Sequence, residues 1–594
     1  MKLTFANDLA HELKAKYNLD DLTVTPEICP PNFDGDLTVN CFVLAKQLKA
    51  RNPIAVATEV KQFLDGHNDV VDAQVAKAFV NITLKPEALL RDTIQDEGQI
   101  LAEAILPKQE QRHILIEFSA PNTNKPQHLG HVRNNTIGMA TASILESAGH
   151  RVTRINLVND RGIHICKSMI AYQRFGNNTT PEREGKKGDH LVGDFYVAYD
   201  KEYRKQLAEL RKNNPDLADK SDDDLFLNTE IGRAAQDMLI AWENNDEDVR
   251  NLWTKMNQWV FDGFAETYRR MGVTFKHTYL ESETYMLGKD IIQDGLERGV
   301  FKKREDGATV IDFDDPSLGS KVVLRSDGTS VYVTQDIGTT LLKQKDYNPD
   351  QQIWVVGDEQ IRHFKVLFAI LKALGYEWAD NLTHMAYGMV NLPTGKMKSR
   401  EGTVVDADDL IDEMEALAKQ ATLEKAGDTP PENLDERAQT IAMAALKFML
   451  LKVNPKTTIM FDPQASIKFE GDTGPYVLYA YARIASMLRK AQDQEDETSP
   501  DWSALKDDAE KKLAIRCALY PEMLQKSARE LDSSTLANYL LDLAKDFSTF
   551  YRICPVLNAE EPALKAARLH LSKCVKDILK HGLNALTINT LESM

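Results

Sequence analysis

The sequence is short of cysteine, of apolar runs and of positive charge. Its six cysteines are scattered singly and never form a Cys-x-x-Cys pair, which argues against a disulfide framework or a zinc knuckle and predicts buried, reduced thiols. No apolar run approaches the ~18 residues that span a bilayer. The N-terminal stretch MKLTFANDLAHELKAKYNLD has neither an apolar signal core nor a small-residue cleavage site, so we expect a cytoplasmic protein that does not enter a membrane.

Acidic residues outnumber basic ones over the chain as a whole. The 72 Lys and Arg against 90 Asp and Glu give a formal net charge of −18 and a pI of about 5.3. This deficit argues against indiscriminate nucleic-acid binding. Net charge describes the whole surface, however, and a groove can be locally basic, so composition leaves RNA binding open. Acidic runs such as SDDDL and ENNDEDV are predicted to be solvated faces.

The composition is that of an ordinary soluble protein, with 43% hydrophobic and 27% charged residues. A chain of 594 residues is too long for one core, so several domains are expected. Residues 1–108 mix a helical pattern (NCFVLAKQLKA) with an alternating stretch (AFVNITL) and end at the polar break LPKQEQR. They predict a small N-terminal α/β domain.

Residues 109–404 have the pattern of a Rossmann-type catalytic domain. HILIEF predicts a buried strand, LGHVRNNTIGMATASILESAGH a helix and RVTRINLVND a second strand. Such a β-α-β unit favours a parallel sheet that binds ligands at the carboxyl ends of its strands. QQIWVVGDEQ predicts another strand, and VVLRSDGTSVYVTQDIG (322–338) a hairpin that leads into a strand. The polar, mostly helical stretch of about 175–270 is expected to be an insertion.

Strands become scarce after residue 404. Residues 405–464 predict a linking helical region, and residues 465–594 an all-α bundle. One apolar stripe at helical spacing consists of Leu536, Leu540, Leu543, Phe547 and Phe550. The predicted fold class is therefore multidomain α/β, with a small N-terminal α/β domain, a parallel-sheet catalytic domain that carries an insertion, and a C-terminal all-α bundle.

The stretch EFSAPNTNKPQHLGHVRNNTIG (117–138) places two histidines where a predicted strand gives way to a helix. Three interpretations compete. A zinc site needs ligands beyond His128 and His131, and no carboxylate–histidine array is nearby. A polar helix cap with no further function is common at such positions. A phosphate site also fits, because a helix start offers unpaired N–H groups and a positive dipole end. Gly130 permits close approach of a ligand, and Lys125 adds charge.

A phosphate site here requires a second basic element, because no Walker-type phosphate loop occurs in this stretch. GMVNLPTGKMKSREGTVV (388–405) supplies one. Its Lys396, Lys398 and Arg400 lie in a loop bounded by proline and glycine, a pattern that alone predicts a flexible solvated turn. Together on one α/β sheet, the histidine turn and the basic loop predict a site for a polyphosphate.

At this point the residues resemble a known family. HLGH and KMKSR are similar to the HIGH and KMSKS signatures of class I aminoacyl-tRNA synthetases. The wider pattern of EFSAPNTNKPQHLGH, YVTQDIG, YGMVNLPTGKMKSREG and YVLYAYARIASMLRK resembles arginyl-tRNA synthetases over nearly the whole chain. The resemblance implies ATP-dependent ligation of L-arginine to tRNA(Arg) through an arginyl-adenylate. It also implies Mg²⁺ with the ATP, no structural metal, a monomer, and a C-terminal anticodon-binding domain of the DALR type.

The resemblance also assigns residues to the ATP site. The catalytic contacts to phosphate fall to His128, His131, Lys396 and Lys125. The other ATP contacts fall to Ser119, Gly130, Gly388, Met389, Val390, Lys398 and Ser399. The usual signature has a second lysine at the position of Ser399, and some relatives supply one just before the HIGH element instead. Lys125 occupies such a position and is assigned the missing charge, with Lys398 as the alternative.

Five further residues match the family's arginine site. Asp336 is expected to pair with the guanidinium, because planar fork-to-fork pairing is strong and selective. Tyr332 is expected to lie along the aliphatic stem, Glu117 and Asn122 to hold the α-amino group, and Gln360 to complete the set. A helix N-cap before IGTTLLKQ is the alternative role for Asp336.

The tRNA contacts follow from the resemblance in outline. The N-terminal domain is expected to touch the tRNA elbow, and the C-terminal bundle to read the anticodon. Tyr476, Tyr479 and Tyr481, interleaved with Arg483, are candidates for stacking on bases, although most helix aromatics are core residues. The chain ends in TLESM and lacks the arginine that this family often has before its terminal methionine, which puts one anticodon contact in doubt.

Three other functions compete with this interpretation. A class I synthetase for cysteine or glutamate shares the signatures, but a cysteine enzyme is expected to have zinc-binding cysteines. A smaller nucleotidyltransferase shares the histidine turn, but does not need a long helical domain. A catalytically silent tRNA-binding relative does not need the complete set of site residues, of which only Ser399 departs from the usual pattern.

Overall fold

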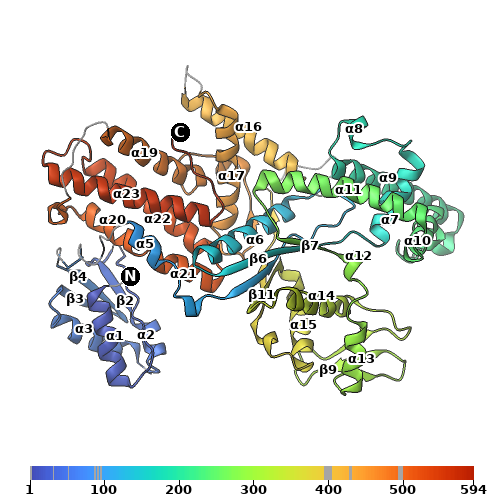
Figure 1. Cartoon of the computed structure of the whole chain (residues 1–594), viewed down its shortest axis with the longest axis horizontal. Coiled ribbons are helices and arrows are strands. Elements are labelled where there is room, and N and C mark those ends of the chain that lie inside the picture. The colour runs from blue at the N-terminus through green and yellow to red at the C-terminus, as the bar shows by residue number, and fades with distance from the viewer. Residues whose placement is uncertain are drawn as a thin grey trace.

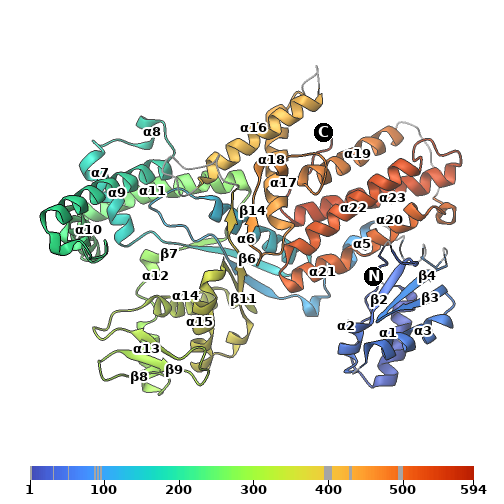
Figure 2. The same cartoon turned by 180° about the vertical axis from the view of Figure 1, so that it is seen from behind.

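The computed structural model describes residues 3–30, 32–50, 52–85, 88–89, 93, 97–392, 405–426, 431–492 and 500–594. A five-stranded sheet lies at the centre of the molecule, with a helical insertion on one side and the C-terminal helices on the other (Figures 1 and 2). The N-terminal module lies against the C-terminal helices, at the opposite end of the molecule from the insertion (Figures 1 and 2). The central sheet therefore lies between the insertion on one side and the C-terminal helices with the N-terminal module on the other.

The N-terminal module is a small α/β unit, as the sequence predicted. Its antiparallel sheet has the order β1-β2-β4-β3, formed by Glu27–Ile28, Leu37–Asn40, Phe79–Leu84 and Val70–Ala76. Helices α1 (Thr4–Tyr17), α2 (Cys41–Gln47) and α3 (Pro53–Asp65) pack with this sheet. The side chains of Asn40 and Asn52 accept backbone N–H groups at the starts of α2 and α3, as good N-caps do.

The central sheet is wholly parallel, with strand order β12-β11-β5-β6-β7. In chain order these strands are β5 (His113–Glu117), β6 (Arg151–Val158), β7 (His277–Leu280), β11 (Gln351–Gly357) and β12 (Leu382–Tyr387). α6 (Leu129–Ser147) packs on the face that carries Ile114 and Ile116, and α14 (Tyr332–Tyr347) on the face of Leu115. Strand order reverses between β5 and β11, and such a switch point opens a crevice at the carboxyl ends of the strands.

The predicted insertion is helical and connects β6 to β7. It contains α7 (Ile163–Phe175), α8 (Pro181–Glu184), α9 (Gly188–Asn213), α10 (Glu230–Glu243) and α11 (Glu247–Met271). Buried residues such as Met169, Leu191 and Val260 form a core of its own. Between β7 and β11 lie α12 (Glu281–Thr284), α13 (Lys289–Glu297) and a small antiparallel sheet of β8 (Lys302–Lys303), β9 (Thr309–Asp312) and β10 (Ser320–Leu324).

The strand predicted at the end of residues 322–338 is wrong, because these residues begin α14. The Asp-Gly turn does occur, and Leu324 pairs with Ser330 across it. Beyond the turn, Val333 and Ile337 are buried four residues apart, which is the spacing of one helix face. The Thr334 hydroxyl donates to the Val323 carbonyl and so joins the helix start to β10.

The C-terminal part is helical, as predicted. It contains α16 (Ala407–Ala426), α17 (Leu434–Leu451), α18 (Pro463–Ser466), α19 (Gly474–Gln492), α20 (Asp508–Ala518), α21 (Tyr520–Glu530), α22 (Ser533–Ile553) and α23 (Pro562–Ala585), with the short parallel pair β13 (Val390–Asn391) and β14 (Ile459–Met460). All five residues of the apolar stripe on α22 are fully buried. The six cysteines are buried, and none of them forms a disulfide. Among the described residues, no helix is long and apolar enough to cross a membrane.

Candidate active site

The histidine turn joins β5 to α6, and its two imidazoles cap the helix. The His128 Nδ1 accepts the Gly130 N–H at 3.1 Å. The His131 Nδ1 accepts the His128 N–H at 3.2 Å, which completes a capping box. A Cβ added at Gly130 would lie 2.9 Å from the His128 ring, so glycine lets the ring reach this position. The prediction that these histidines cap the helix is therefore confirmed.

The caps also fix the chemical state of both rings. Because each Nδ1 accepts a backbone N–H, the neutral ring carries its proton on Nε2. Burial, followed by the charge of Lys125, lowers the pKa of His128 to about 4. Burial, His128 and Lys125 hold the pKa of His131 well below its usual value. The turn thus presents two neutral Nε2–H donors beside the positive end of α6, an arrangement suited to phosphate oxygens.

The predicted lysine contacts Lys396 and Lys398, together with Ser399, lie outside the described residues. Both flanks of that segment lie against α6. After the segment, Val405 accepts the Leu129 N–H at 2.9 Å, and the Ala407 N–H donates to the Gln127 carbonyl at 3.0 Å. Before the segment, the Met389 carbonyl accepts a guanidinium N–H of Arg133. The described residues on both sides of the segment therefore lie against the first two turns of α6.

Arg133 is a site residue that sequence reasoning missed. It is fully buried in α6, and besides Met389 it donates to the carbonyls of Pro455 at 3.0 Å and Thr457 at 2.7 Å. Burial lowers the pKa of its guanidinium. These contacts hold residues 388–390, the predicted adenine site, where a Cβ on Gly388 would lie 2.8 Å from the backbone of residues 456–458. The sequence signal for this contact is an arginine within a helix that has few other charged residues. Such a helix is buried on all sides, and a buried guanidinium needs hydrogen-bond partners.

The structure brings the predicted arginine-binding residues to one region. Glu117 ends β5, and the loop residue Asn122 bridges to the backbone after β6. Gln360 is exposed just after β11, and Tyr332 opens α14 with 80% of its surface accessible. Asp336 is the fifth residue of α14, so its predicted alternative role as an N-cap is wrong.

Two of these carboxylates already have basic partners that the sequence did not reveal. The Asp336 Oδ2 lies 2.6 Å from the His363 Nε2, and this hydrogen bond raises the pKa of His363 although burial opposes it. The Glu117 Oε2 lies 2.5 Å from the Lys343 ammonium, which is almost wholly buried and lies 5.6 Å from the Trp354 ring centroid. His363 and Lys343 follow the predicted site residues at helical spacing, but nothing local indicated that they pair.

The Ser119 hydroxyl is a buried structural contact in this structure. Its oxygen lies 2.7 Å from the Tyr268 hydroxyl, and its backbone N–H donates to the Asn134 side chain at 2.6 Å. The backbone at Ser119 has a positive φ of 60°, which bends the chain sharply where it leaves β5. Ser119 therefore shapes the turn that leads to His128.

The predicted RNA-facing tyrosines divide into two groups. Tyr476 and Tyr479 line an open cavity of about 610 Å³, and the Tyr479 ring has the Lys425 ammonium at 3.4 Å and Arg483 at 4.7 Å. Tyr481 is fully buried, and its hydroxyl donates to Glu592 at 2.5 Å. Its prediction as a stacking residue is wrong, because two residues along α19 turn the side chain toward the bundle core.

The comparisons with known proteins agree with this architecture. The family model for the class I (R) tRNA synthetase catalytic domain matches residues 98–462, that for the DALR anticodon binding domain residues 477–594, and that for the arginyl tRNA synthetase N-terminal domain residues 4–84. Arginine–tRNA ligase of Flavobacterium psychrophilum is 43% identical over 98% of each chain, and that of Bacteroides thetaiotaomicron 43% identical over 95% and 94%. The structure of Thermus thermophilus arginyl-tRNA synthetase superimposes with a TM-score of 0.80 at 27% identity, over the whole of both chains.

Proposed function

The chain belongs to the arginyl-tRNA synthetase family, and from that premise we propose how its residues divide the work of the reaction. The protein catalyses ATP-dependent attachment of arginine to tRNA through an arginyl-adenylate, with AMP and pyrophosphate as products. In the first step the arginine carboxylate attacks the α-phosphorus, and pyrophosphate leaves with the electron pair of the broken P–O bond. This chemistry depends on positioning and on stabilising phosphate charge.

His128 and His131 donate their Nε2–H groups to the ATP phosphates, and Lys396 neutralises the departing pyrophosphate. Lys125 supplies the charge that Ser399 cannot, with Lys398 as the alternative. One observation supports this division above the others: two neutral imidazole donors stand at the start of α6, where both described flanks of the lysine segment lie. Mg²⁺ would enter with ATP as part of the substrate and would supply positive charge that shields the phosphates.

The adenosine lies against backbone in this proposal. Gly130 lets the nucleotide approach the start of α6, and residues 388–390 contact the adenine through their backbone. Arg133 holds these residues in place by donating to the Met389 carbonyl. Ser119 contributes through the shape of the turn, since its hydroxyl is bonded to Tyr268.

The arginine substrate lies in the crevice between β5 and β11. Asp336 pairs with the guanidinium, and the exposed ring of Tyr332 lies along the aliphatic stem. Glu117 and Asn122 hold the α-amino group, and Gln360 closes the site. Because Lys343 already balances the charge of Glu117, the amino group shares that carboxylate with a second cation.

The second step passes the arginyl group to the 2′-hydroxyl of the terminal adenosine of tRNA(Arg). Residues 1–108 contact the tRNA elbow and residues 465–594 the anticodon, while 405–464 link the bundle to the catalytic domain of 109–404. Tyr479 with Arg483 is the leading candidate for a base contact, because both line the open cavity beside α19. We place the enzyme in the cytoplasm as a monomer.

ATP–pyrophosphate exchange tests this function. Exchange is expected with arginine alone among the amino acids, and only when tRNA(Arg) is present, because activation in this family typically needs the cognate tRNA. Incubation with each amino acid, with and without tRNA, measures both requirements. Exchange supported by another amino acid contradicts the arginine assignment, and no exchange under any condition indicates a catalytically silent relative.

A further inference from the structure

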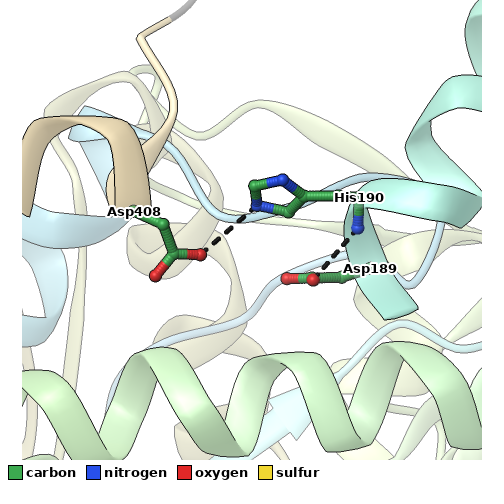
Figure 3. A group of neighbouring side chains, drawn as sticks. All are labelled: Asp189, His190 and Asp408. Atoms are coloured by element: carbon green, nitrogen blue, oxygen red, sulfur yellow. Dashed lines mark hydrogen bonds and ion pairs between the residues drawn. The ribbon is translucent and has the colours of Figure 1, made fainter. Parts of the chain in front are cut away.

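A group of charged side chains joins the insertion to the start of α16. Asp189, His190 and Asp408 have one ligand atom each within 4.8 Å of one another, and among the described residues no other such group of histidine, cysteine and carboxylate residues occurs (Figure 3). His190 and Asp189 lie at the first turn of α9, and Asp408 at the first turn of α16, so the two helices meet here (Figure 3).

The cations of this group are side chains of the protein. The Lys187 ammonium lies 2.6 Å from the Asp408 Oδ2, 3.0 Å from the Asp189 Oδ2 and 2.6 Å from the Thr267 hydroxyl. Arg270 reaches the other oxygen of Asp408 at 3.4 Å. An ammonium therefore already lies between the two carboxylates, and a metal ion is not needed to balance them. We call Lys187, Asp189, His190, Arg270 and Asp408 the α9–α16 ion network.

The carboxylates of this network are buried, so each needs a cationic partner close by. Asp189 has no accessible surface, and a Cβ at Gly263 in α11 would lie 2.4 Å from its Oδ1. Burial alone raises the pKa of Asp408, but hydrogen bonds from His190 and Lys187 hold it far below its usual value. Asp408 is thus an ionised, nearly buried carboxylate whose charge is balanced mainly by Lys187 and His190 of the insertion.

The network continues to the histidine turn through Asp406. The His190 Nε2 lies 3.5 Å from the Asp406 Oδ2, and the other oxygen of Asp406 caps α16 by accepting the Asp408 N–H at 2.8 Å. Asp406 pairs through its backbone with His128, since its neighbours Val405 and Ala407 bond to Leu129 and Gln127. One short stretch of chain therefore touches the insertion on one side and the histidine turn on the other.

We propose that Lys187 and His190 are positioning residues for adenylate formation, and that they hold residues 405–407 so that the His128 donor faces the phosphates. This inference rests on the proposed role of His128. In this proposal neither residue contacts substrate; Lys187 acts through Asp408, and His190 acts through Asp406 and Asp408. A displacement of ~1 Å at a reacting group can lower a rate by ~100-fold, so loss of the network should lower kcat with little change in the KM for ATP.

Lys187→Met tests the proposal in the full-length enzyme with tRNA present. We expect the kcat for ATP–pyrophosphate exchange to fall about 10- to 100-fold, with the KM for ATP and arginine changed less than about threefold, and Lys187→Arg to recover most of the loss. Lys186→Met is the matched control, because the side chain of Lys186, next to Lys187 in the chain, is exposed and pairs with Asp194. If Lys187→Met fails to fold, His190→Phe, which removes the donor that faces Asp406 and Asp408, is expected to lower kcat with the same small change in KM.

A second background separates this inference from the function it rests on. In the His128→Asn enzyme, Lys187→Met should lower kcat by less than about threefold, because the donor that Lys187 positions is already absent. If His128→Asn alone leaves exchange intact, the proposed function fails. Two results would overturn the positioning role alone, provided that His128→Asn is slow. In the first, Lys187→Met lowers kcat by the same factor in both backgrounds. In the second, Lys187→Met has the same kcat as the control Lys186→Met.

Discussion

His128→Asn should slow arginyl-adenylate formation about 100- to 1,000-fold while leaving the free energy of unfolding nearly unchanged. The Asn oxygen can accept the Gly130 N–H as the His128 Nδ1 does, and Asn is among the best N-cap residues. What the variant lacks is the Nε2–H that we assign to a phosphate oxygen. Single-turnover adenylate formation and urea unfolding measure the two effects separately.

Two further variants separate the loss of the cap from the loss of the donor. His128→Ala should be as slow as His128→Asn and also less stable by about 1 kcal/mol. Asn52→Ala, which removes the cap of α3 in the N-terminal module, should lose similar stability and keep the rate. A His128→Asn enzyme within about threefold of the normal rate would mean that His128 is a cap and nothing more.

The low pKa of His128 has a further consequence for stability. Because its pKa is about 4 in the folded protein and about 6.5 when unfolded, the unfolded chain binds more protons between these values. His128 therefore makes the free energy of unfolding fall as the pH drops from about 6.5 toward 4, and His128→Asn should reduce that fall.

Asp336→Ala should raise the KM for arginine about 30- to 1,000-fold and leave the KM for ATP within about threefold. The reason is that the guanidinium enters a desolvated crevice and loses its only carboxylate partner in our assignment. Initial rates of exchange at varied arginine and ATP measure both constants. Asp346→Ala is a matched control, since Asp346 lies on the same helix but pairs with the Tyr279 hydroxyl. A rise of less than threefold for Asp336→Ala contradicts the assignment.

His363 gives the same site a predicted pH dependence. Its pKa is raised by Asp336, so the charged imidazolium holds Asp336 at low pH and competes with the guanidinium. The competition disappears as the pH rises through the pKa of His363 and the imidazolium loses its proton. The KM for arginine should therefore rise as the pH is lowered, and His363→Gln should abolish that rise.

Local patterns were enough to predict the elements that depend on near neighbours. β5, α6 and β6 follow from an apolar run, a capped helix and a second run. The insertion follows from a polar, mostly helical stretch, and the bundle from apolar stripes at helical spacing. The strand predicted within residues 322–338 failed because Val331 and Val333 alternate like a strand, whereas burial of Val333 with Ile337 decides for a helix. The sequence is compatible with both the strand period and the helix period, and tertiary packing determines which one forms.

Contacts between distant segments could not be predicted from the sequence. Arg133 meets carbonyls more than 250 residues away, and Lys187 meets Asp408 across 221 residues. Lys343 and Tyr481 are buried by elements that no local pattern places beside them. These residues support the site and its surroundings, whereas the proposed ligand contacts lie at strand ends and helix starts, where spacing and residue type are informative.

The central claim is that the histidine turn and the lysine segment act on one triphosphate, and a double-mutant cycle of His128→Asn with Lys396→Ala tests it most directly. Rates of adenylate formation in the four enzymes give the coupling free energy between the two residues. We predict a coupling of about 1–3 kcal/mol, as expected for groups that stabilise the same developing charge. Rate losses that simply multiply, with a coupling below about 0.5 kcal/mol, would show that the two residues act independently and contradict the account.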